Sequence, residues 1–392
     1  MKTDAAQFAD ISQAGTWSMV EVGDLGEFVN GYPFKPGEWA VSKGDPIIRI
    51  QNLTDPAKPF NYFAGDIGAR YRVHPGDLLV SWSASLDAFL WNGPDAWLNQ
   101  HIFKVTPNMD VVDPDFLYFL MKREIRNIAL SARGSTMKHV TGKIFRQHRV
   151  SLPPLDEQRR IARILSTIQV AIASSDNEVR NSRTLRRSLL TTLLRDAQKS
   201  SPMLPLEDIA TIERGRFTHR PRNDPAFYGG DTPFIQTGDI TRVASAGGIV
   251  RGYSQTLNER GLEVSRVFPE RTIAITIAAN IGFTAMLAFP AAFPDSIIAI
   301  TPTAAVDAEY LNYYLSTQQE EMDRRAPRGT QKNINIEFLR PWPVLVPSLK
   351  TQETIAEAMR VVEAEITACS QDGAALRQLF SSAFSTLLEP AP

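Results

Sequence analysis

The chain has 392 residues, about twice the length of a common domain, so two globular units are expected. Hydrophobic residues make up 43% and charged residues 22%, as in ordinary globular proteins. The single cysteine, Cys369, excludes an internal disulfide framework and any zinc site built from several cysteines. The net charge of −1 argues against a protein wrapped wholly in nucleic acid, but not against two local DNA-binding patches.

The first part of the chain is predicted to form a mixed α/β domain over residues 1–154. Its opening residues are acidic and lack an apolar core, unlike a secretory signal, so we expect a cytoplasmic protein. Short β-branched runs separated by Gly, Pro and Asn are typical of strands. A helix is expected after Asp113, where the run Phe-Leu-Tyr begins.

The end of this segment is basic. Residues 125–155 contain no Asp or Glu, and Gly134-Ser135-Thr136 supplies small residues whose backbone N–H groups can approach phosphate closely. A solvated basic face is the alternative interpretation. DNA contacts are expected from these residues of the stretch: Arg133, Ser135, Lys138, Lys143 and Arg146.

A proline-free stretch follows, and it predicts a long helix over residues 157–198 within a spacer segment 155–200. Residues at alternating intervals of four and three form a heptad seam. The seam consists of Ile161, Leu165, Ile168, Ile172, Ser175, Val179, Ser182, Arg186, Leu189 and Leu193. Its middle is polar, and the neighbouring Leu185 is a candidate to replace Arg186 there.

A second mixed segment, residues 201–347, opens with an arginine cluster between Arg214 and Arg222. Its positional counterpart is the run from Asn30 to Lys35. Arg pairs with guanine and Asn with adenine in the major groove, so this difference fits two domains that read different bases. We expect DNA contacts from Lys35, Arg214, Arg216 and Arg220, without assigning any base.

The segment from Ile273 to Phe289 has 17 residues without a charge, near the lower limit for a membrane-spanning helix. The sequence Asn280-Ile281-Gly282 interrupts it with a turn signal. Two buried strands are therefore expected, and no association with a membrane.

The second mixed segment ends as the first does. A helix is expected after Asp307, and DNA contacts are expected from Arg328, Thr330 and Lys332 in the loop that follows. A second proline-free stretch then predicts a long helix over residues 352–388, within a segment 348–392. Its seam consists of Ile355, Met359, Val362, Ile366, Cys369, Gly373, Leu376, Phe380, Ala383 and Leu387.

The two halves are copies of one another. The segment from Leu152 to Ala162 recurs from Val346 to Ala356, at an offset of 194 residues. Other matching segments occur in the same order: 46–54 with 233–241, 106–107 with 301–302, 113–118 with 307–312, and 133–135 with 328–330. Such a series indicates a tandem duplication.

The two long seams must be buried. A helix of about 40 residues extends ~60 Å, more than the width of a 150-residue domain, so we favour helix-on-helix packing over each helix packing on its own domain. The first helix leads from domain one to domain two and the second must return. We therefore predict an α+β fold in which the helices form an antiparallel coiled coil with a recognition domain at each end.

The sequence contains none of the catalytic motifs that we sought. It has no phosphate-binding loop and no Gly-x-Ser-x-Gly elbow, and Asp224-Pro225-Ala226-Phe227 lacks the second proline of the amino-methyltransferase motif. Its histidines, His74, His101, His139, His148 and His219, show no His-x-x-x-His spacing. We expect no catalytic residue, metal site or cofactor in this chain.

The motif Pro-Pro-Leu-x-Glu-Gln before a long helix, preceded by Gly-Ser-Thr-x-Lys, resembles the specificity (S) subunit of Type I restriction-modification systems. Residues 75–81 and Asn99-Gln100-His101 fit the same family, whereas the second copy departs at Ser348, Lys350 and Thr351. The resemblance implies two target recognition domains that each read half of a bipartite, asymmetric DNA site, with the paired helices as a ruler. It also implies partners: two methyltransferase (M) subunits, restriction (R) subunits and double-stranded DNA. S-adenosylmethionine, ATP and Mg²⁺ would belong to those partner subunits.

Two other classes of function stay open at this stage. An enzyme with diverged motifs would bind S-adenosylmethionine or cleave DNA by itself. A structural adaptor would join protein partners without any salt-dependent affinity for DNA.

Overall fold

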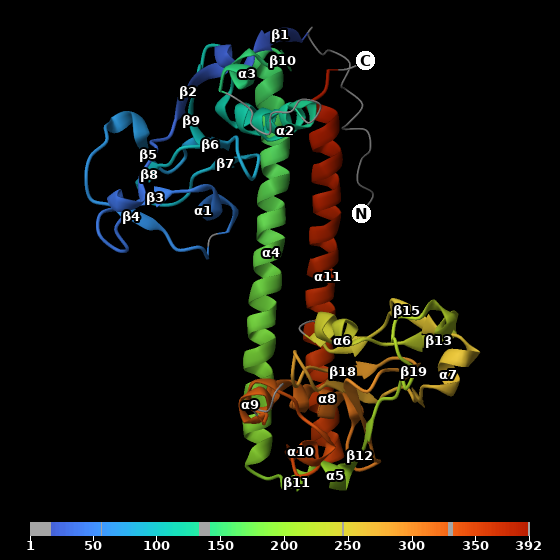
Figure 1. The fold of residues 1–392 in the computed structure, drawn as a ribbon. Coiled ribbons are helices and arrows are strands. Elements are labelled where there is room, and N and C mark those ends of the chain that lie inside the picture. The colour runs from blue at the N-terminus through green and yellow to red at the C-terminus, as the bar shows by residue number, and fades with distance from the viewer. Residues whose placement is uncertain (1–16, 56, 133–141, 245–246, 328–331, 391–392) are drawn as a thin grey trace. The chain divides into compact units, whose positions relative to one another are not determined.

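The computed structural model describes residues 17–55, 57–132, 142–244, 247–327 and 332–390. The chain forms two compact units: a first unit of residues 1–173 and 375–392, and a second unit of residues 174–374. Two long helices, α4 (Leu155–Gln198) and α11 (Leu349–Leu387), each contribute one part to each unit (Figure 1).

The described part of the first unit contains two four-stranded sheets and one two-stranded ribbon. Its strands are β1 (Ser18–Glu21), β2 (Gly26–Asn30), β3 (Asp45–Ile48), β4 (Asn61–Phe63), β5 (Arg72–Val73), β6 (Leu78–Ser81), β7 (Asp87–Leu90), β8 (Ala96–Leu98), β9 (Ile102–Pro107) and β10 (Arg149–Leu152). One sheet is antiparallel, in the order β2-β9-β6-β7. The other has the order β4-β3-β8-β5, with β3 and β8 parallel, and β1 pairs with β10.

The second unit repeats this arrangement. Its strands are β11 (Met203–Pro205), β12 (Ala210–Arg214), β13 (Tyr228–Phe234), β14 (Ile249–Val250), β15 (Gln255–Leu257), β16 (Val267–Phe268), β17 (Ile273–Thr276), β18 (Thr284–Leu287), β19 (Ala291–Ala292), β20 (Ile297–Pro302) and β21 (Pro343–Leu345). The sheets have the orders β12-β20-β17-β18-β14 and β15-β13-β19-β16, and β11 pairs with β21. Apart from the added edge strand β14, the topology is that of the first unit, which confirms the tandem duplication and the mixed α/β domains.

The shorter helices connect and cover these sheets. In the first unit they are α1 (Ile50–Thr54), α2 (Pro114–Ala132) and α3 (Gly142–Gln147). In the second they are α5 (Leu206–Ile209), α6 (Thr237–Ala244), α7 (Glu259–Glu263), α8 (Ala308–Thr317), α9 (Gln319–Arg325) and α10 (Ile336–Leu339). Within the described ranges, 3-10 turns span Val22–Leu25, Pro36–Glu38, Ala69–Tyr71 and Pro225–Phe227.

The helices expected after the two aspartates are present, and each aspartate caps its helix. Asp113 Oδ1 accepts a hydrogen bond from Phe116 N at 3.0 Å, and Asp307 Oδ1 accepts one from Tyr310 N at 2.9 Å. A carboxylate at this position satisfies a backbone donor that has no partner inside the helix. The sequence therefore determines where α2 and α8 begin.

The uncharged segment from Ile273 to Phe289 forms two buried strands, β17 and β18, as predicted. All residues of both strands are buried, and they pair antiparallel in the middle of the five-stranded sheet. Among the described residues, no helix is long and apolar enough to cross a bilayer.

The long helices pair with each other in both units. In the first unit, Ile161 of α4 belongs to the same core as Phe380 near the end of α11. In the second unit, Leu190 near the end of α4 belongs to the same core as Ile355 near the start of α11. The helices therefore run antiparallel, which confirms the predicted coiled coil.

The predicted seam positions are buried or half-buried along both helices. In the second unit, the Ser175 hydroxyl donates to the carbonyl oxygen of Cys369 at 2.9 Å, so even a polar seam residue is satisfied across the pair. The division of the chain at residues 154, 200 and 347 stays a prediction, because the compact units cut through both long helices.

The expectation that Leu185 replaces Arg186 in the seam is wrong. Leu185 is 60% exposed, whereas the Arg186 side chain is 14% exposed and pairs with Glu363 at 3.1 Å. The Tyr313 hydroxyl donates to the other Glu363 oxygen at 2.9 Å. Burial raises the pKa of the Glu363 carboxyl, although the charge of Arg186 acts in the opposite direction. A buried carboxylate partner thus keeps an arginine where the heptad pattern favours an apolar residue.

A glutamine in the recurring motif holds each domain helix against its long helix. Gln158 Oε1 accepts from Asp113 N at 2.8 Å, and its Nε2 donates to the carbonyls of Val111 and Pro153 at 3.1 and 2.8 Å. We call this arrangement the glutamine clamp. It exists because buried backbone groups that no helix or sheet can satisfy need a side-chain partner.

The second unit has the same glutamine clamp 194 residues later. Gln352 Oε1 accepts from Asp307 N at 2.7 Å, and its Nε2 donates to the carbonyls of Ala305 and Pro347 at 3.5 and 2.8 Å. Both glutamines are almost completely buried, at 1% and 0% exposure. The helix start itself differs between the copies, since the Ser348 hydroxyl caps α11 by accepting from Thr351 N.

Candidate nucleic-acid interface

In the first unit, three chain segments meet where strands of the two sheets end. We call this place the first corner; it consists of residues 30–32, Trp82 and residues 99–101. Gly31 N donates to the carbonyl of Ile102 at 3.0 Å, and Tyr32 N donates to that of Leu98 at 2.8 Å. Trp82 N donates to the carbonyl of His101 at 3.2 Å. Backbone hydrogen bonds alone thus fix the positions of the three segments.

The second unit has an equivalent second corner, made of residues 214–216, Ile277 and residues 294–296. Gly215 N donates to the carbonyl of Ile297 at 2.9 Å, and Arg216 N donates to that of Phe293 at 3.0 Å. Ile277 N donates to the carbonyl of Ser296 at 3.4 Å. The predicted correspondence between the Asn30 and Arg214 segments is confirmed by these matching hydrogen bonds.

Each corner requires a glycine. A Cβ atom on Gly31 would overlap the carbonyl oxygen of Asn99, and a Cβ atom on Gly215 would overlap that of Pro294. Only glycine lets the two backbones approach this closely. The residues before each glycine, Asn30 and Arg214, are therefore held at equivalent and well-defined places.

Aromatic and amide side chains fill the first corner. Trp82 Nε1 donates to Asn30 Oδ1 at 3.1 Å, and its ring lies 4.8 Å from that of His101 and 5.9 Å from that of Phe103. His101 adopts a φ of 73°, an unusual backbone conformation for a residue with a side chain. Its buried Nδ1 has no hydrogen-bond partner among the described residues. Strain and unsatisfied polar atoms of this kind often accompany functional sites.

Arginine side chains fill the second corner, and most of them also hold the local structure. Arg214 Nε donates to the carbonyl of Asp295 at 2.7 Å. Arg216 donates to the carbonyls of Ser265 and Glu263 at 3.0 and 3.2 Å. Arg220 donates to the carbonyls of Phe217 and His219 and to the Asp295 carboxylate.

The predicted basic stretch of the first unit is described only in part. Arg133, Ser135 and Lys138 lie outside the described residues. Lys143 and Arg146 are exposed on α3, and Arg146 donates to the carbonyl of Phe28 at 2.9 Å and lies 5.8 Å from the Phe103 ring. Because Phe103 also contacts Trp82, α3 lies beside the first corner.

A buried carboxylate anchors the end of this stretch. His148 Nε2 lies 3.0 Å from Glu124 Oε2, and Arg123 pairs with the other carboxylate oxygen. Burial would raise the pKa of Glu124, but the hydrogen bond to His148 and the charge of Arg123 outweigh it and lower that pKa. His148, between α3 and β10, thus packs against Glu124 of α2.

The predicted basic loop of the second unit is less positive than its sequence suggests. Arg328 and Thr330 lie outside the described residues. Lys332 pairs with Asp323 at 2.8 Å, and Arg324 and Arg325 both pair with Glu321. Just after the loop, Ile334 N donates to the carbonyl of Ile277 at 3.1 Å, which brings this segment to the second corner.

Lys35 is exposed beyond the first corner, where Tyr32 and Phe34 pack edge-on at 4.9 Å. Its backbone N–H donates to Glu38 at 2.6 Å, so its ammonium group is not needed for this turn. Trp82 and Asp295 lie at the corners but were not expected from the sequence. The glycines at positions 31 and 215 were the signal that could have indicated a close backbone approach there.

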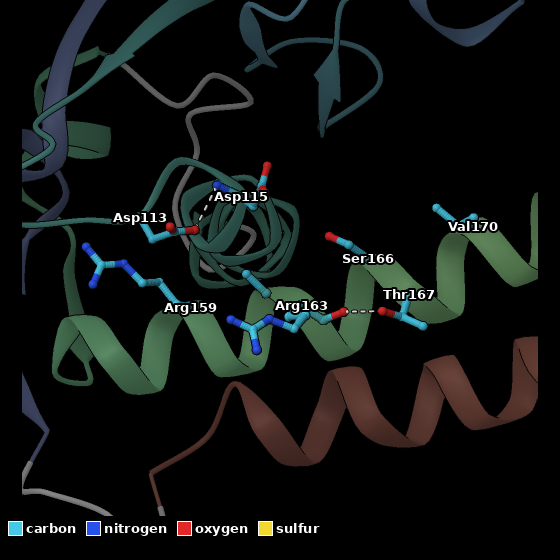
Figure 2. A pocket seen from close by; sticks show the side chains of 8 residues that line it. Asp113, Asp115, Arg159, Arg163, Ser166, Thr167 and Val170 are labelled. Carbon is cyan, nitrogen blue, oxygen red and sulfur yellow. Dashed lines mark hydrogen bonds between the residues drawn. The ribbon is translucent and has the colours of Figure 1, made fainter.

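An open groove of about 490 Å³ lies between α2 and α4 in the first unit (Figure 2). Figure 2 shows Asp113 and Asp115 at the start of α2, with Arg159 and Arg163 on α4 facing the same space. The exposed Val170 continues the groove along α4. Its mixture of charges does not indicate a single class of ligand.

No group of three or more His, Cys, Asp or Glu side chains is placed to hold a metal ion in the part of the chain that the structure describes.

The family model for the type I restriction modification DNA specificity domain matches residues 14–179 and 201–373, one match for each half of the repeat. The chain belongs to this family.

Curated relatives include two proteins named as specificity subunits of type I restriction enzymes. The EcoBI subunit of Escherichia coli is 29% identical over 161 residues, which cover 41% of this chain and 34% of that protein. The putative MjaX subunit of Methanocaldococcus jannaschii is 22% identical over 379 residues, covering 88% of this chain and 87% of that protein. The match to the E. coli subunit therefore spans only about a third of its length.

Solved structures of the family share the fold of this chain. The S subunit of a type I restriction-modification system from M. genitalium gives a TM-score of 0.62 at 13% identity, covering 97% of this chain and 98% of that one. A chain from a study of complex assembly and conformational transition of the type I system gives 0.57 at 16% identity, covering 95% and 98%. These likenesses extend over both units and the long helices.

Proposed function

We propose that this chain is the DNA-reading specificity subunit of a type I restriction-modification complex. Each unit reads one half of a bipartite, asymmetric site in double-stranded DNA. The observation that carries this function is the pair of corners, which share one backbone frame but present different side chains. Duplicated frames with different surfaces suit two half-sites of different sequence.

Phosphate contacts supply the affinity in this proposal. The expected contributors are the following residues: Lys35, Arg133, Ser135, Lys138, Lys143, Arg146, Arg328, Thr330 and Lys332. The described ones among them lie in or near the corners, where a bound duplex would pass. Such contacts release counterions, so DNA affinity falls steeply with salt.

The long helices set the gap between the half-sites. Removing one heptad from α4 and the facing heptad from α11 shortens the pair by ~10 Å, since each helical residue rises about 1.5 Å. One base pair rises about 3.4 Å, so the gap should shrink by about three base pairs. The facing heptads can be chosen around Ser175 and Cys369, which are hydrogen-bonded to each other.

The partners follow from the family and belong to the same proposal. Two methyltransferase subunits dock on this chain and supply S-adenosylmethionine-dependent methylation of adenine, and restriction subunits supply ATP- and Mg²⁺-dependent activity. The chain itself performs no catalysis. It works in the cytoplasm, where the cell's DNA is accessible.

Selection from a randomised DNA duplex library tests the function. The full-length chain, alone and with its methyltransferase subunits, should enrich a motif with two defined parts and a fixed gap. Sequence-independent binding only, or salt-insensitive binding, would overturn the proposal in favour of an adaptor. Binding of S-adenosylmethionine by the isolated chain in a calorimeter would favour the enzyme alternative.

A further inference from the structure

The two corners allow a more specific assignment. Asn30 and Arg214 are the last residues of β2 and β12, and each precedes the corner glycine. Asn30 pairs with Phe103 on β9, and Arg214 pairs with Ile298 on β20. Both side chains are exposed. The two residues therefore occupy the same place in the two units.

The orientation of the Asn30 amide is fixed by Trp82. An indole N–H can only donate a hydrogen bond, so the atom of Asn30 that lies 3.1 Å from Trp82 Nε1 must be its oxygen, Oδ1. The Nδ2 amino group then has no acceptor among the described residues. An exposed carboxamide held in this way presents a donor beside an acceptor. The major-groove edge of adenine offers the complementary pair, acceptor N7 and donor N6.

Trp82 is itself held in place. Its ring packs against His101 at 4.8 Å and Phe103 at 5.9 Å, and its backbone N–H donates to the carbonyl of His101. Trp82 is a positioning residue, because it orients Asn30 without needing to touch DNA.

Arg214 is oriented by a different device. Its Nε donates to the carbonyl of Asp295 at 2.7 Å, and neither Nη atom has an acceptor among the described residues. The Asp295 carboxylate is already occupied by Arg220 and Arg222, so it does not pair with Arg214. A guanidinium held through Nε presents its two Nη donors side by side. The major-groove edge of guanine offers two acceptors, O6 and N7, in matching geometry.

We propose that Asn30 reads an adenine and Arg214 reads a guanine at corresponding positions of the two half-sites. This inference rests on the proposed function, because it requires that both units bind double-stranded DNA. It adds which side chain discriminates in each unit and which base it selects. The shared frame explains how one duplicated fold reads two different bases.

Two conservative substitutions test the assignment by selection from the same randomised duplex library. Asn30→Asp keeps the acceptor for Trp82 but removes the Nδ2 donor, so one A·T position of one half-site should lose its preference roughly 10- to 100-fold. Arg214→Lys keeps the charge but removes the fork, so one G·C position of the other half-site should lose its preference by a similar factor. Asn92→Asp and Arg180→Lys, at exposed positions away from the corners, are matched controls that should leave the motif unchanged.

Trp82→Phe provides a third readout that a merely structural role would not give. It removes the indole donor but keeps an aromatic ring against His101, so the adenine preference should weaken while the affinity for unspecific DNA stays constant. Asn30→Ser is the second variant at this position, and the remaining positions of the same half-site report that the altered unit is folded in each variant.

The outcomes separate the two levels of the proposal. A wild-type chain that enriches no bipartite motif contradicts the proposed function, and the base assignment fails with it. A wild-type motif that Asn30→Asp and Arg214→Lys leave intact overturns the base assignment alone. The same conclusion follows if both variants alter the same half-site, or if the altered positions are not A·T and G·C respectively.

Discussion

Equivalent places in the seams of the two units contain different chemistry. In the second unit, Arg186 lies over the Tyr313 ring at 6.0 Å and pairs with Glu363. In the first unit, the residues 194 positions away are Phe380 and Phe119, whose rings lie 6.3 Å apart. The same position between the paired long helices can thus hold either an aromatic contact or an ion pair. The surrounding apolar residues already determine how the helices pack.

The glutamine clamp behaves in the opposite way. Gln158 and Gln352 keep the same three backbone partners in both units. The corners, by contrast, keep their backbone and change their side chains. Within one duplicated chain, side chains that both copies retain support the architecture, and side chains that differ are free to serve ligand recognition or local packing.

The ion pair in the second seam should give the largest effect on stability. Arg186→Met leaves the Glu363 carboxylate buried without its partner, and this should lower the free energy of unfolding by about 3–5 kcal/mol. Urea unfolding followed by circular dichroism measures the change. Arg183→Met, at an exposed position on the same helix, is the matched control.

The stability that this ion pair provides can also be tested by replacing its residues with those of the first unit, and by changing the pH. The triple variant Arg186→Phe, Tyr313→Phe and Glu363→Gln introduces the three residues that the first unit has 194 positions away, namely Phe380, Phe119 and Gln169. Its free energy of unfolding should stay within about 1–2 kcal/mol of the wild type. Burial raises the pKa of Glu363 in the folded chain, so this carboxyl contributes less stability as pH rises through that pKa. Without Arg186 the pKa rises further, so the defect of Arg186→Met should be smaller at pH 5 than at pH 8. A pH-independent defect contradicts this account.

The glutamine clamps should come next. Gln158→Leu and Gln352→Leu each leave one backbone N–H and two carbonyls without a partner, and each should cost about 2–4 kcal/mol. Because the two clamps are equivalent, the two losses should agree within about 1 kcal/mol. Gln198→Leu, at an exposed position, is the control in the same unfolding experiment. If only one of the two substitutions lowers the free energy of unfolding, the two glutamine clamps do not stabilise their units equally.

Phosphate contact should show a smaller effect that differs between the units. Lys143 is exposed and has no ion-pair partner among the described residues, whereas Lys332 already pairs with Asp323. Lys143→Ala should therefore reduce the slope of log affinity against log salt by about 0.9, and Lys332→Ala by clearly less. Fluorescence anisotropy with one labelled duplex over a salt series measures both slopes. Equal slopes in the two variants would contradict the expectation that Lys143 contributes more to phosphate binding than the ion-paired Lys332.

Much of the fold could be predicted because its signals are local. The recurrence of Leu152 to Ala162 at Val346 to Ala356, the aspartate caps and the seam residues are all visible within short stretches. The turn at Asn280 likewise divides an uncharged segment into two strands. Arg186 was the exception, because its partner Glu363 lies 177 residues away in the sequence.

The corners were harder to predict. Trp82 and Asn30 are 52 residues apart, and Arg214 and Asp295 are 81 residues apart, so only the sheet topology brings each pair together. The arginine cluster suggested four free cations, but backbone carbonyls and one carboxylate hold most of them. Composition identifies such a cluster, whereas the hydrogen bonds decide which atoms stay available to DNA.

The smallest effect should come from the turns that follow β6 and β17. Ala84 and Ala279 occupy equivalent turns, and both have positive φ, at 56° and 62°. An L-residue in this conformation costs roughly 1–2 kcal/mol, and glycine recovers this energy but loses about 0.5–1 kcal/mol of chain entropy. Ala84→Gly and Ala279→Gly should therefore each stabilise the chain by about 0.5 kcal/mol. For units of this size that corresponds to a rise of about 1–2 °C in Tm. Ala304→Gly, at an exposed position that lacks positive φ, should be slightly destabilising and serves as the control. A stabilisation in one turn but not in the other would show that the two units do not strain these turns equally.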